Sequence, residues 1–243
     1  MISELEKIMI EEREQEIEVC SGTEQEGILM SFMAPFYENR KTLADTIIKN
    51  LEKRNMYGCY CATIAEAKEK ALSFVKPGDS VGFGGSMSFM DSGVYQALKE
   101  RDDITMYDRG DYPPEEQYDV LRKCFYADHY FMSTNAIAID GQMVNIDGSG
   151  NRVACLIFGP KNVIMLVGMN KVAPTIEDAV RRAREIASPP NNVRIGLPNP
   201  CTRIGRCADC LSETCICNQF VITRRSKDKD RIKVILVGED LGY

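Results

Sequence analysis

Residues 134–160 are rich in polar side chains and glycines, contain one arginine, and include two short apolar segments. Alternating residues 136–139, the Asp140-Gly141 pair and a return segment from residue 143 predict a tight β-hairpin. The hairpin leads into Asn145, Asp147, Asn151 and Arg152, where a guanidinium fork suits a carboxylate or phosphate. A glycine-rich turn whose side chains cap only their own backbone is the alternative. The density of polar groups beside an arginine favours a ligand pocket.

A second glycine-rich segment, residues 82–88, follows a predicted strand at 80–83 and opens a predicted helix at 89–101. Its glycines let the backbone approach a ligand, and Ser86 and Ser88 add hydroxyl groups. The segment lacks the phosphate-loop lysine and the dinucleotide fingerprint, so neither nucleotide class follows. Close strand–helix packing is the alternative. The carboxyl end of a parallel strand is nevertheless where open α/β sheets bind ligands, and we expect Ser86 and Arg152 to converge there.

Lys171 follows a predicted strand at 163–167 and is the best-placed cation at the same sheet edge. The sequence leaves open whether it pairs with an anionic substrate or is an ordinary surface lysine. His129 is the only histidine, and no neighbouring residues complete a nucleophile–histidine pair with it. We therefore interpret His129 as structural.

The ten cysteines fall into two groups, because five are scattered and five lie within residues 201–217. The Cys207-x-x-Cys210 spacing lets two thiolates reach one ion, and Cys201 and Cys215 are near enough to complete a four-sulfur shell. Cys217 is a spare or a substitute ligand. Zinc and an iron–sulfur cluster both suit such ligands. A metal-free reduced loop, or a disulfide formed after isolation, stays open as the alternative.

Composition limits the class of protein. The 243 residues are enough for one larger α/β domain, and no segment approaches the ~20 apolar residues of a membrane span. The acidic start lacks the positive region of a secretory signal, so we expect a cytoplasmic protein without membrane contact. A formal charge of −6 argues against nucleic-acid binding. The basic residues at 224–233 alternate with aspartates and predict a solvated loop.

Apolar runs and helical periodicities alternate along the chain and predict a mostly parallel sheet flanked by helices. Thr63 and Thr175 have the position of helix caps, for helices at 63–74 and 175–187. Residues 1–19 are charged and amphipathic, and predict a helical arm that packs on a partner subunit in a homodimer. The expected organisation is an arm over residues 1–32 and an α/β domain over residues 33–239, including the cysteine-rich segment 201–217.

The segment 135–160, together with 163–167, Asn170-Lys171 and 179–187, resembles the LUD domain of the lactate utilisation protein C family, formerly a domain of unknown function. The resemblance covers residues 33–239. It implies the sugar-phosphate isomerase and CoA-transferase-like fold, and association with iron–sulfur partners in growth on lactate. It also implies that two sets of residues hold a small anionic metabolite between them: Gly82, Gly84, Gly85, Ser86 and Ser88 opposite Asn135, Asp140, Asn145, Asp147 and Arg152. By analogy with isomerases of that fold, Asp140 or Asp147 is a candidate proton acceptor.

Three functions stay open at this point. The first is a component of lactate or related 2-hydroxy-acid utilisation that binds a small anion and acts with iron–sulfur partners. The second is a stand-alone isomerase-like or transferase-like enzyme on a phosphorylated or CoA-linked small molecule. The third is a metal-binding or redox-sensing subunit that uses the cysteines.

Overall fold

The structure is a computed structural model that describes the backbone from residue 22 and the side chains from residue 33. The chain divides into one unit up to Arg40 and a second unit, Lys41–Tyr243. Helix α2 (Gly22–Lys53) contributes residues to both units. Residues 1–21, which hold most of the predicted arm, lie outside the described residues. No helix in the described part of the chain has the length and apolar character needed to cross a membrane.

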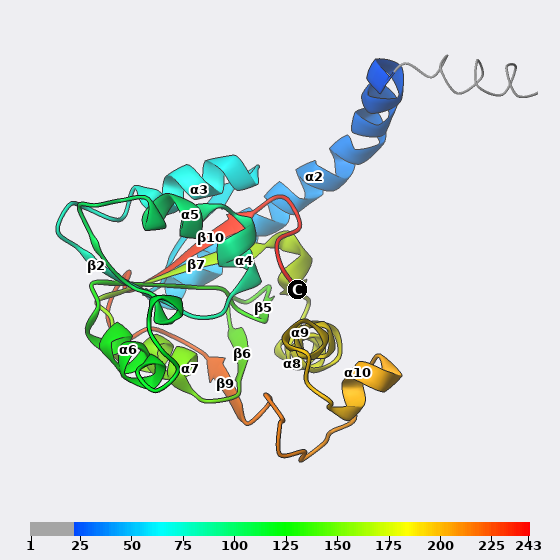
Figure 1. Ribbon diagram of the computed structural model, residues 1–243. Helices are drawn as coiled ribbons and strands as arrows, with labels where there is room; N and C mark the ends of the chain where they lie inside the picture. The colour runs from blue at the N-terminus through cyan, green and yellow to red at the C-terminus, as the bar shows by residue number, and fades with distance from the viewer. Residues whose placement is uncertain (1–21) are drawn as a thin grey trace, which may run out of the picture. The chain divides into compact units, whose positions relative to one another are not determined.

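A six-stranded parallel sheet forms the centre of the second unit (Figure 1). Its order is β1 (Tyr57–Cys61), β10 (Ile232–Val237), β7 (Asn162–Gly168), β4 (His129–Met132), β2 (Ser80–Phe83) and β3 (Thr105–Tyr107). Helices α3 (Ile64–Leu72), α4 (Met87–Asp91) and α5 (Val94–Lys99) lie together on one side of it, and α6 (Gln117–Lys123) and α7 (Asn151–Ile157) on the other. The predicted α/β class is confirmed.

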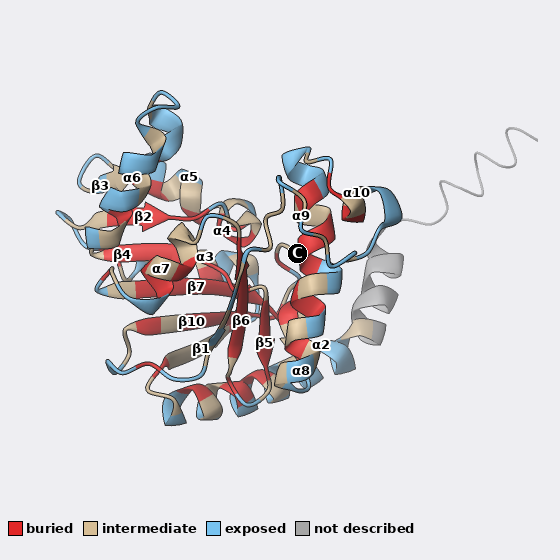
Figure 2. Ribbon diagram, turned by 90° about the horizontal axis from the view of Figure 1, so that it is seen from below, coloured by how far each residue is buried: buried red, intermediate tan, exposed pale blue. Residues whose placement is uncertain are grey.

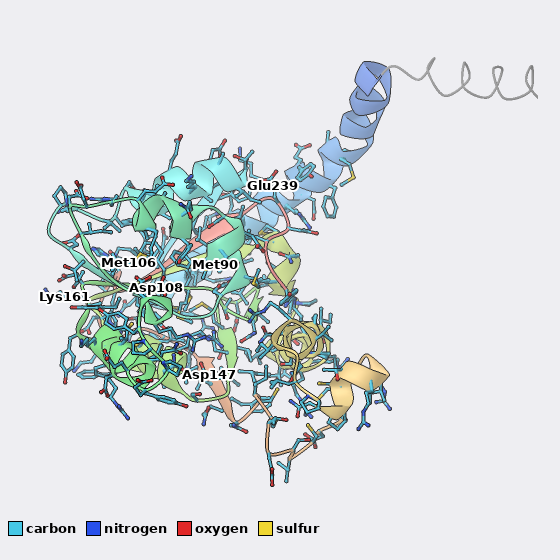
Figure 3. All side chains as sticks on the ribbon, viewed as in Figure 1. Met90, Met106, Asp108, Asp147, Lys161 and Glu239 are labelled. Atoms are coloured by element: carbon cyan, nitrogen blue, oxygen red, sulfur yellow. The ribbon has the colours of Figure 1, made fainter. Side chains whose placement is uncertain are left out.

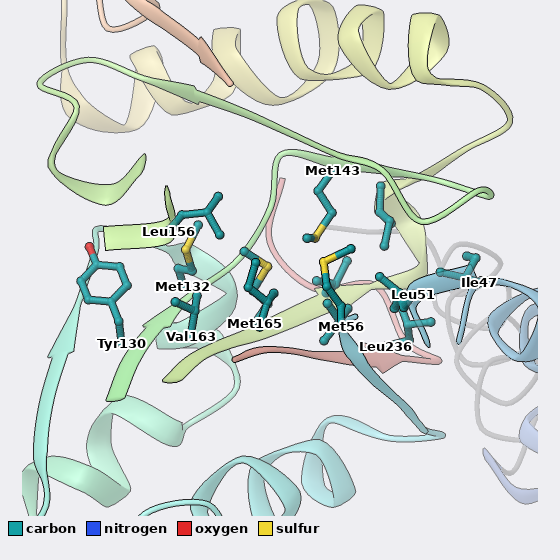
Figure 4. Packing of buried hydrophobic residues seen from close by; sticks show 14 of the residues in the cluster. Ile47, Leu51, Met56, Tyr130, Met132, Met143, Leu156, Val163, Met165 and Leu236 are labelled. Atoms are coloured by element: carbon teal, nitrogen blue, oxygen red, sulfur yellow. The ribbon is translucent and has the colours of Figure 1, made fainter. Parts of the chain in front are cut away.

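Both faces of the sheet are buried, which explains why its central strands are continuous apolar runs. In β7, Val163 and Met165 face one core, while Ile164 and Leu166 face the other. The first core also contains Met132 and residues from α2, and is rich in methionine, whose flexible side chain fills irregular gaps (Figure 4). These cores fix the strand ends, and with them the loops that follow each strand.

A second, four-stranded sheet lies across the first, as the crossing of β5 and β6 over the parallel strands in Figure 2 shows. Its order is β8 (Val172–Ala173), β5 (Ala136–Ala138), β6 (Met143–Asp147) and β9 (Gln219–Thr223). Ile137 and Met143 pack on the core of the main sheet, whereas Ala136 and Val144 face a third core beneath helix α8 (Ile176–Arg182). The predicted hairpin is therefore buried on both faces.

The helical predictions need two corrections. The helix predicted over 89–101 is broken into α4 and α5, because Gly93 has φ +72° and adopts the left-handed conformation that glycine tolerates. The helix begun by Thr175 does not end at residue 187. It continues through a π-helical turn, η4 (Ala183–Ala187), into α9 (Ser188–Ile195), followed by α10 (Pro200–Ile204).

Candidate functional site

Loops at the carboxyl ends of β2, β4 and β7 meet the end of β6 around a pocket of about 260 Å³, here called the polar pocket. Ser86 comes from the loop after β2 and Ser88 from the first turn of α4, while Ser133 and Asn135 come from the loop after β4. The structure therefore brings Ser86 and Arg152 to one cavity, as the sequence predicted. The further lining residues from the predicted set are Gly85, Asp147, Asn151 and Lys171.

Arg152, at the start of α7, is the polar centre of one wall. Its Nη1 donates to Asn145 Oδ1 at 2.7 Å, its Nη2 donates to Asn135 Oδ1 at 3.1 Å, and its Nε lies 3.3 Å from Asp147 Oδ2. Nη1 also donates to the Ser133 carbonyl at 3.2 Å. The side chain is 15% exposed. Because protein acceptors surround the guanidinium, Arg152 joins the start of α7 to two other segments of the wall, the loop after β4 and strand β6.

The two candidate acids lie at opposite ends of β6. Asp147, labelled in Figure 3, accepts a hydrogen bond from Gly150 N at 2.7 Å and pairs with Arg152, so it fixes the turn into α7. Asp140 is in the hairpin turn, where it pairs with Arg54 at 2.7 Å and accepts from Gln142 N at 3.0 Å. The structure does not bring Asp140 into the polar pocket, because the length of β6 separates it from Asp147.

Gly82, Gly84 and Asn145 also stay outside the pocket lining. A Cβ atom on Gly82 would lie 2.7 Å from Cys124 Cβ, and one on Gly84 would lie 3.2 Å from Arg152 Cδ. These two glycines therefore allow close packing, which is the alternative that the sequence left open. Asn145 is fully buried, and its side-chain oxygen accepts a hydrogen bond from Arg152.

Lys171 is the cation at the base of the pocket. It is in the short helical turn η3 (Met169–Lys171) after β7 and is only 4% exposed. Its Nζ donates to Ser88 Oγ at 2.6 Å and to Ser133 Oγ at 3.1 Å. Burial, followed by the charges of Arg182 and Arg152, lowers the pKa of Lys171 to about 7. Burial therefore makes the neutral form of this amine far more accessible near neutral pH than that of an exposed lysine.

A second cavity of about 150 Å³, here called the cysteine pocket, is lined by all five clustered cysteines: Cys201, Cys207, Cys210, Cys215 and Cys217. Cys201 lies in α10, and the other four follow in the irregular connection to β9. All five are free thiols. In the described part of the chain, no three His, Cys, Asp or Glu side chains stand ready-made as ligands of one metal ion. The predicted metal therefore stays a prediction.

Comparison with known families settles what kind of domain this is. The sequence pattern of the LUD domain matches residues 44–237. The chain belongs to the LUD domain family. The crystal structure of a DUF162 family protein from Deinococcus radiodurans is similar, with 12% identity and a TM-score of 0.46, covering 82% of this chain and 98% of that one. No curated protein matches the chain.

Several lining residues of this LUD domain were not predicted from sequence. Ser133 and Thr134 directly follow β4, so the rule that singled out the loop after β2 would have found them too. Arg109 follows β3 in the same way. Asn191 and Arg194 reach the pocket from α9, a helix with no distinguishing sequence signal.

The two pockets of the LUD domain share a wall. Ser188, the first residue of α9, lines both of them. In the segment before β9, Ile216 lines the polar pocket, whereas its neighbours Cys215 and Cys217 line the cysteine pocket. Ser188 and the segment 215–217 therefore lie between the two cavities.

Proposed function

We propose that the polar pocket binds a small anionic metabolite, a 2-hydroxy carboxylate of the lactate type, in a protein that acts with iron–sulfur partners. Family membership supports the lactate-utilisation context, since the chain is a LUD domain. The ligand class is inferred from the pocket itself. The observation that carries the proposal is Lys171, a buried amine whose two nearest hydrogen-bond partners are hydroxyl groups.

A buried ammonium group without a carboxylate partner is unfavourable, which is why the pKa of Lys171 is lowered. An anionic ligand next to Nζ would supply the missing opposite charge. Among the described residues of the pocket lining, four are basic and Asp147 alone is acidic. Since Arg152 neutralises Asp147, the remaining field favours an anion.

The volume and the polar groups narrow the class of anion. About 260 Å³ is slightly below the usual range for cavities that bind drug-sized ligands, which suits a molecule with few heavy atoms. Ser86, Asn135 and Asn151 surround the cavity with hydroxyl and amide groups that match a hydroxyl beside a carboxylate. A 2-hydroxy acid presents both groups on adjacent carbons.

Calorimetric titration of the purified chain with L-lactate, glycolate and a sugar phosphate tests this proposal. We expect the 2-hydroxy acids to bind and Lys171→Met to weaken binding at least about tenfold, the loss expected for one charge-assisted hydrogen bond. Lys161→Met is the matched control, because Lys161 is an exposed lysine paired with Asp128 at 2.7 Å. Equal affinity in the wild type and Lys171→Met would refute the ligand role of Lys171.

The lowered pKa of Lys171 also favours the second candidate, a stand-alone enzyme, with Lys171 in place of Asp140 as the proton acceptor. The two functions predict opposite pH profiles. Anion binding needs the protonated amine, so affinity falls as the pH rises through about 7. A general base needs the neutral amine, so turnover by the isolated chain would rise through the same range, with a phosphorylated or CoA-linked substrate.

A further inference from the structure

We propose that the cysteine pocket is a site where thiolates bind a thiophilic metal, either a zinc ion or the iron of an iron–sulfur cluster. The five thiols come from two parts of the chain, helix α10 and the connection to β9, and still line one cavity. Free structural cysteines are normally scattered through apolar cores. Cys124 and Cys155, buried in the main core, are of that kind.

Backbone amides are already directed at two of these sulfur atoms. Asp209 N donates to Cys207 Sγ at 3.4 Å, and Cys217 N donates to Cys215 Sγ at 3.4 Å. In both cases the amide is two residues after the cysteine. Such N–H···S bonds stabilise sulfur that carries negative charge, which is the form that binds a metal.

Side chains of the π-helical turn η4 fix the position of the Cys207-x-x-Cys210 turn. Arg184 donates to Cys207 Sγ at 3.6 Å and to Asp209 Oδ1 at 2.6 Å, and Glu185 Oε2 accepts from Cys207 N at 3.1 Å. Asp209 has φ +49°, a left-handed conformation that is uncommon for a residue other than glycine. The guanidinium also offsets the charge that several thiolates would bring together.

Cys201, Cys207, Cys210 and Cys215 are the four ligands that we assign. Cys217 packs against the third core, beside β6 and α8, and is the spare thiol. The four sulfur atoms must move together when the metal binds, because they do not form a ready-made set. The connection that carries three of them has no helix or strand, so it permits this contraction. Each thiol releases its proton to water as it binds.

The test is anaerobic purification of the full chain, followed by analysis for zinc, iron and acid-labile sulfide, and titration of the metal-free protein with Co²⁺. We expect one zinc ion per chain without colour, or iron and sulfide with visible absorption, and thiolate-to-cobalt charge-transfer bands. Cys207→Ser and Cys210→Ser should each lower metal content and Co²⁺ affinity at least tenfold. Cys217→Ser, in the same pocket, and Cys59→Ser, in β1, should match the wild type.

A circular dichroism spectrum separates loss of the metal from loss of the fold in each variant. If Cys207→Ser does not fold, the wild-type metal content and Co²⁺ titration still decide the question. Wild-type protein without stoichiometric metal and without charge-transfer bands would overturn the proposal. So would a mass that is two hydrogens lower for each pair of pocket cysteines, because that mass identifies a disulfide.

Discussion

The two pockets share Ser188 but are built in different ways. The polar pocket lies at the carboxyl edge of the parallel sheet, where buried strands fix its loops and Arg152 joins its wall segments. The cysteine pocket is lined by short helices, the irregular connection and Phe220 of β9, and the buried side chain of Asn199 joins α9 to the connection. The first is therefore preorganised for its ligand, whereas the second must contract around the metal that we propose.

Arg152→Met is the change with the largest expected effect, because it removes the polar centre of the preorganised pocket. The substitution leaves the Asp147 carboxylate, 8% exposed, without its cation and Asn145 Oδ1 without its donor, while Asn135 Oδ1 keeps only the bond from Ile146 N. Breaking a buried pair in this way costs ~3–5 kcal/mol. Urea unfolding should show that loss for the whole domain. Arg194→Met, which removes an exposed guanidinium bonded to Asn191, should cost less than about 0.5 kcal/mol.

Asn199→Ala is the corresponding change at the cysteine pocket. Asn199 Nδ2 donates to Asn192 Oδ1 at 2.6 Å and to the Thr214 carbonyl at 3.0 Å, while Thr214 Oγ1 donates to Asn199 Oδ1 at 2.8 Å. Loss of these bonds costs ~1–3 kcal/mol. We expect the effect to be local. Hydrogen exchange should accelerate over residues 199–217 and leave β7 protected.

Uniform loss of protection across the sheet in Asn199→Ala would contradict the distinction between the two pockets. Asn191→Ala is the matched control, because within the described part of the chain the Asn191 side-chain oxygen accepts only from Arg194 of the same helix. That variant should exchange like the wild type over residues 199–217.

The sequence predicted where the preorganised pocket lies better than it predicted the hydrogen bonds within it. Apolar runs identified β2 and β7, and the edge rule then placed Ser86 and Lys171 at the same edge of the sheet. Thr63 caps α3 by accepting from Glu66 N at 3.2 Å, as its position predicted. These features are local in sequence, or follow from a general rule of parallel sheets.

The features that sequence reasoning missed depend on long-range pairing. Strand β9 pairs with β6 although more than 70 residues separate them, and its alternate half-buried positions give a weak signal. The hairpin was predicted, but the sequence did not reveal that β6 would put Asp140 far from Arg152. The shared wall of the two pockets likewise depends on a π-helical turn, η4, which the sequence alone did not indicate.

The buried amine of Lys171 gives the next prediction, on the pH dependence of stability. Its pKa is lowered to about 7 in the folded protein, whereas an unfolded lysine titrates near ~10.4. Between these values the unfolded chain binds more protons than the folded chain, so stability rises with pH. Urea unfolding at about pH 7, 8 and 9 should show the wild type gaining up to ~1.4 kcal/mol per pH unit over Lys171→Met.

Lys161→Met is the control for this titration. Lys161 is an exposed lysine whose pKa is raised by the hydrogen bond to Asp128, so its charge does not change in that range. The stability difference between this variant and the wild type should be independent of pH. A similarly flat difference for Lys171→Met would show that Lys171 stays protonated in the folded protein.

Coupling between the pockets is the smallest effect we expect, and it tests whether the shared wall connects them. Metal binding would pull Cys215 inward and move Ile216, the neighbouring residue that lines the polar pocket. Coupling of ~1 kcal/mol corresponds to an approximately fivefold change in the affinity for L-lactate between the metal-loaded and metal-free protein. By reciprocity, L-lactate must change the Co²⁺ affinity by the same factor. Ile216→Ala should reduce both changes, whereas Val193→Ala, an exposed residue of α9 that lines neither pocket, should preserve them. Equal L-lactate affinities in the two metal states would mean that the pockets share a wall without influencing each other.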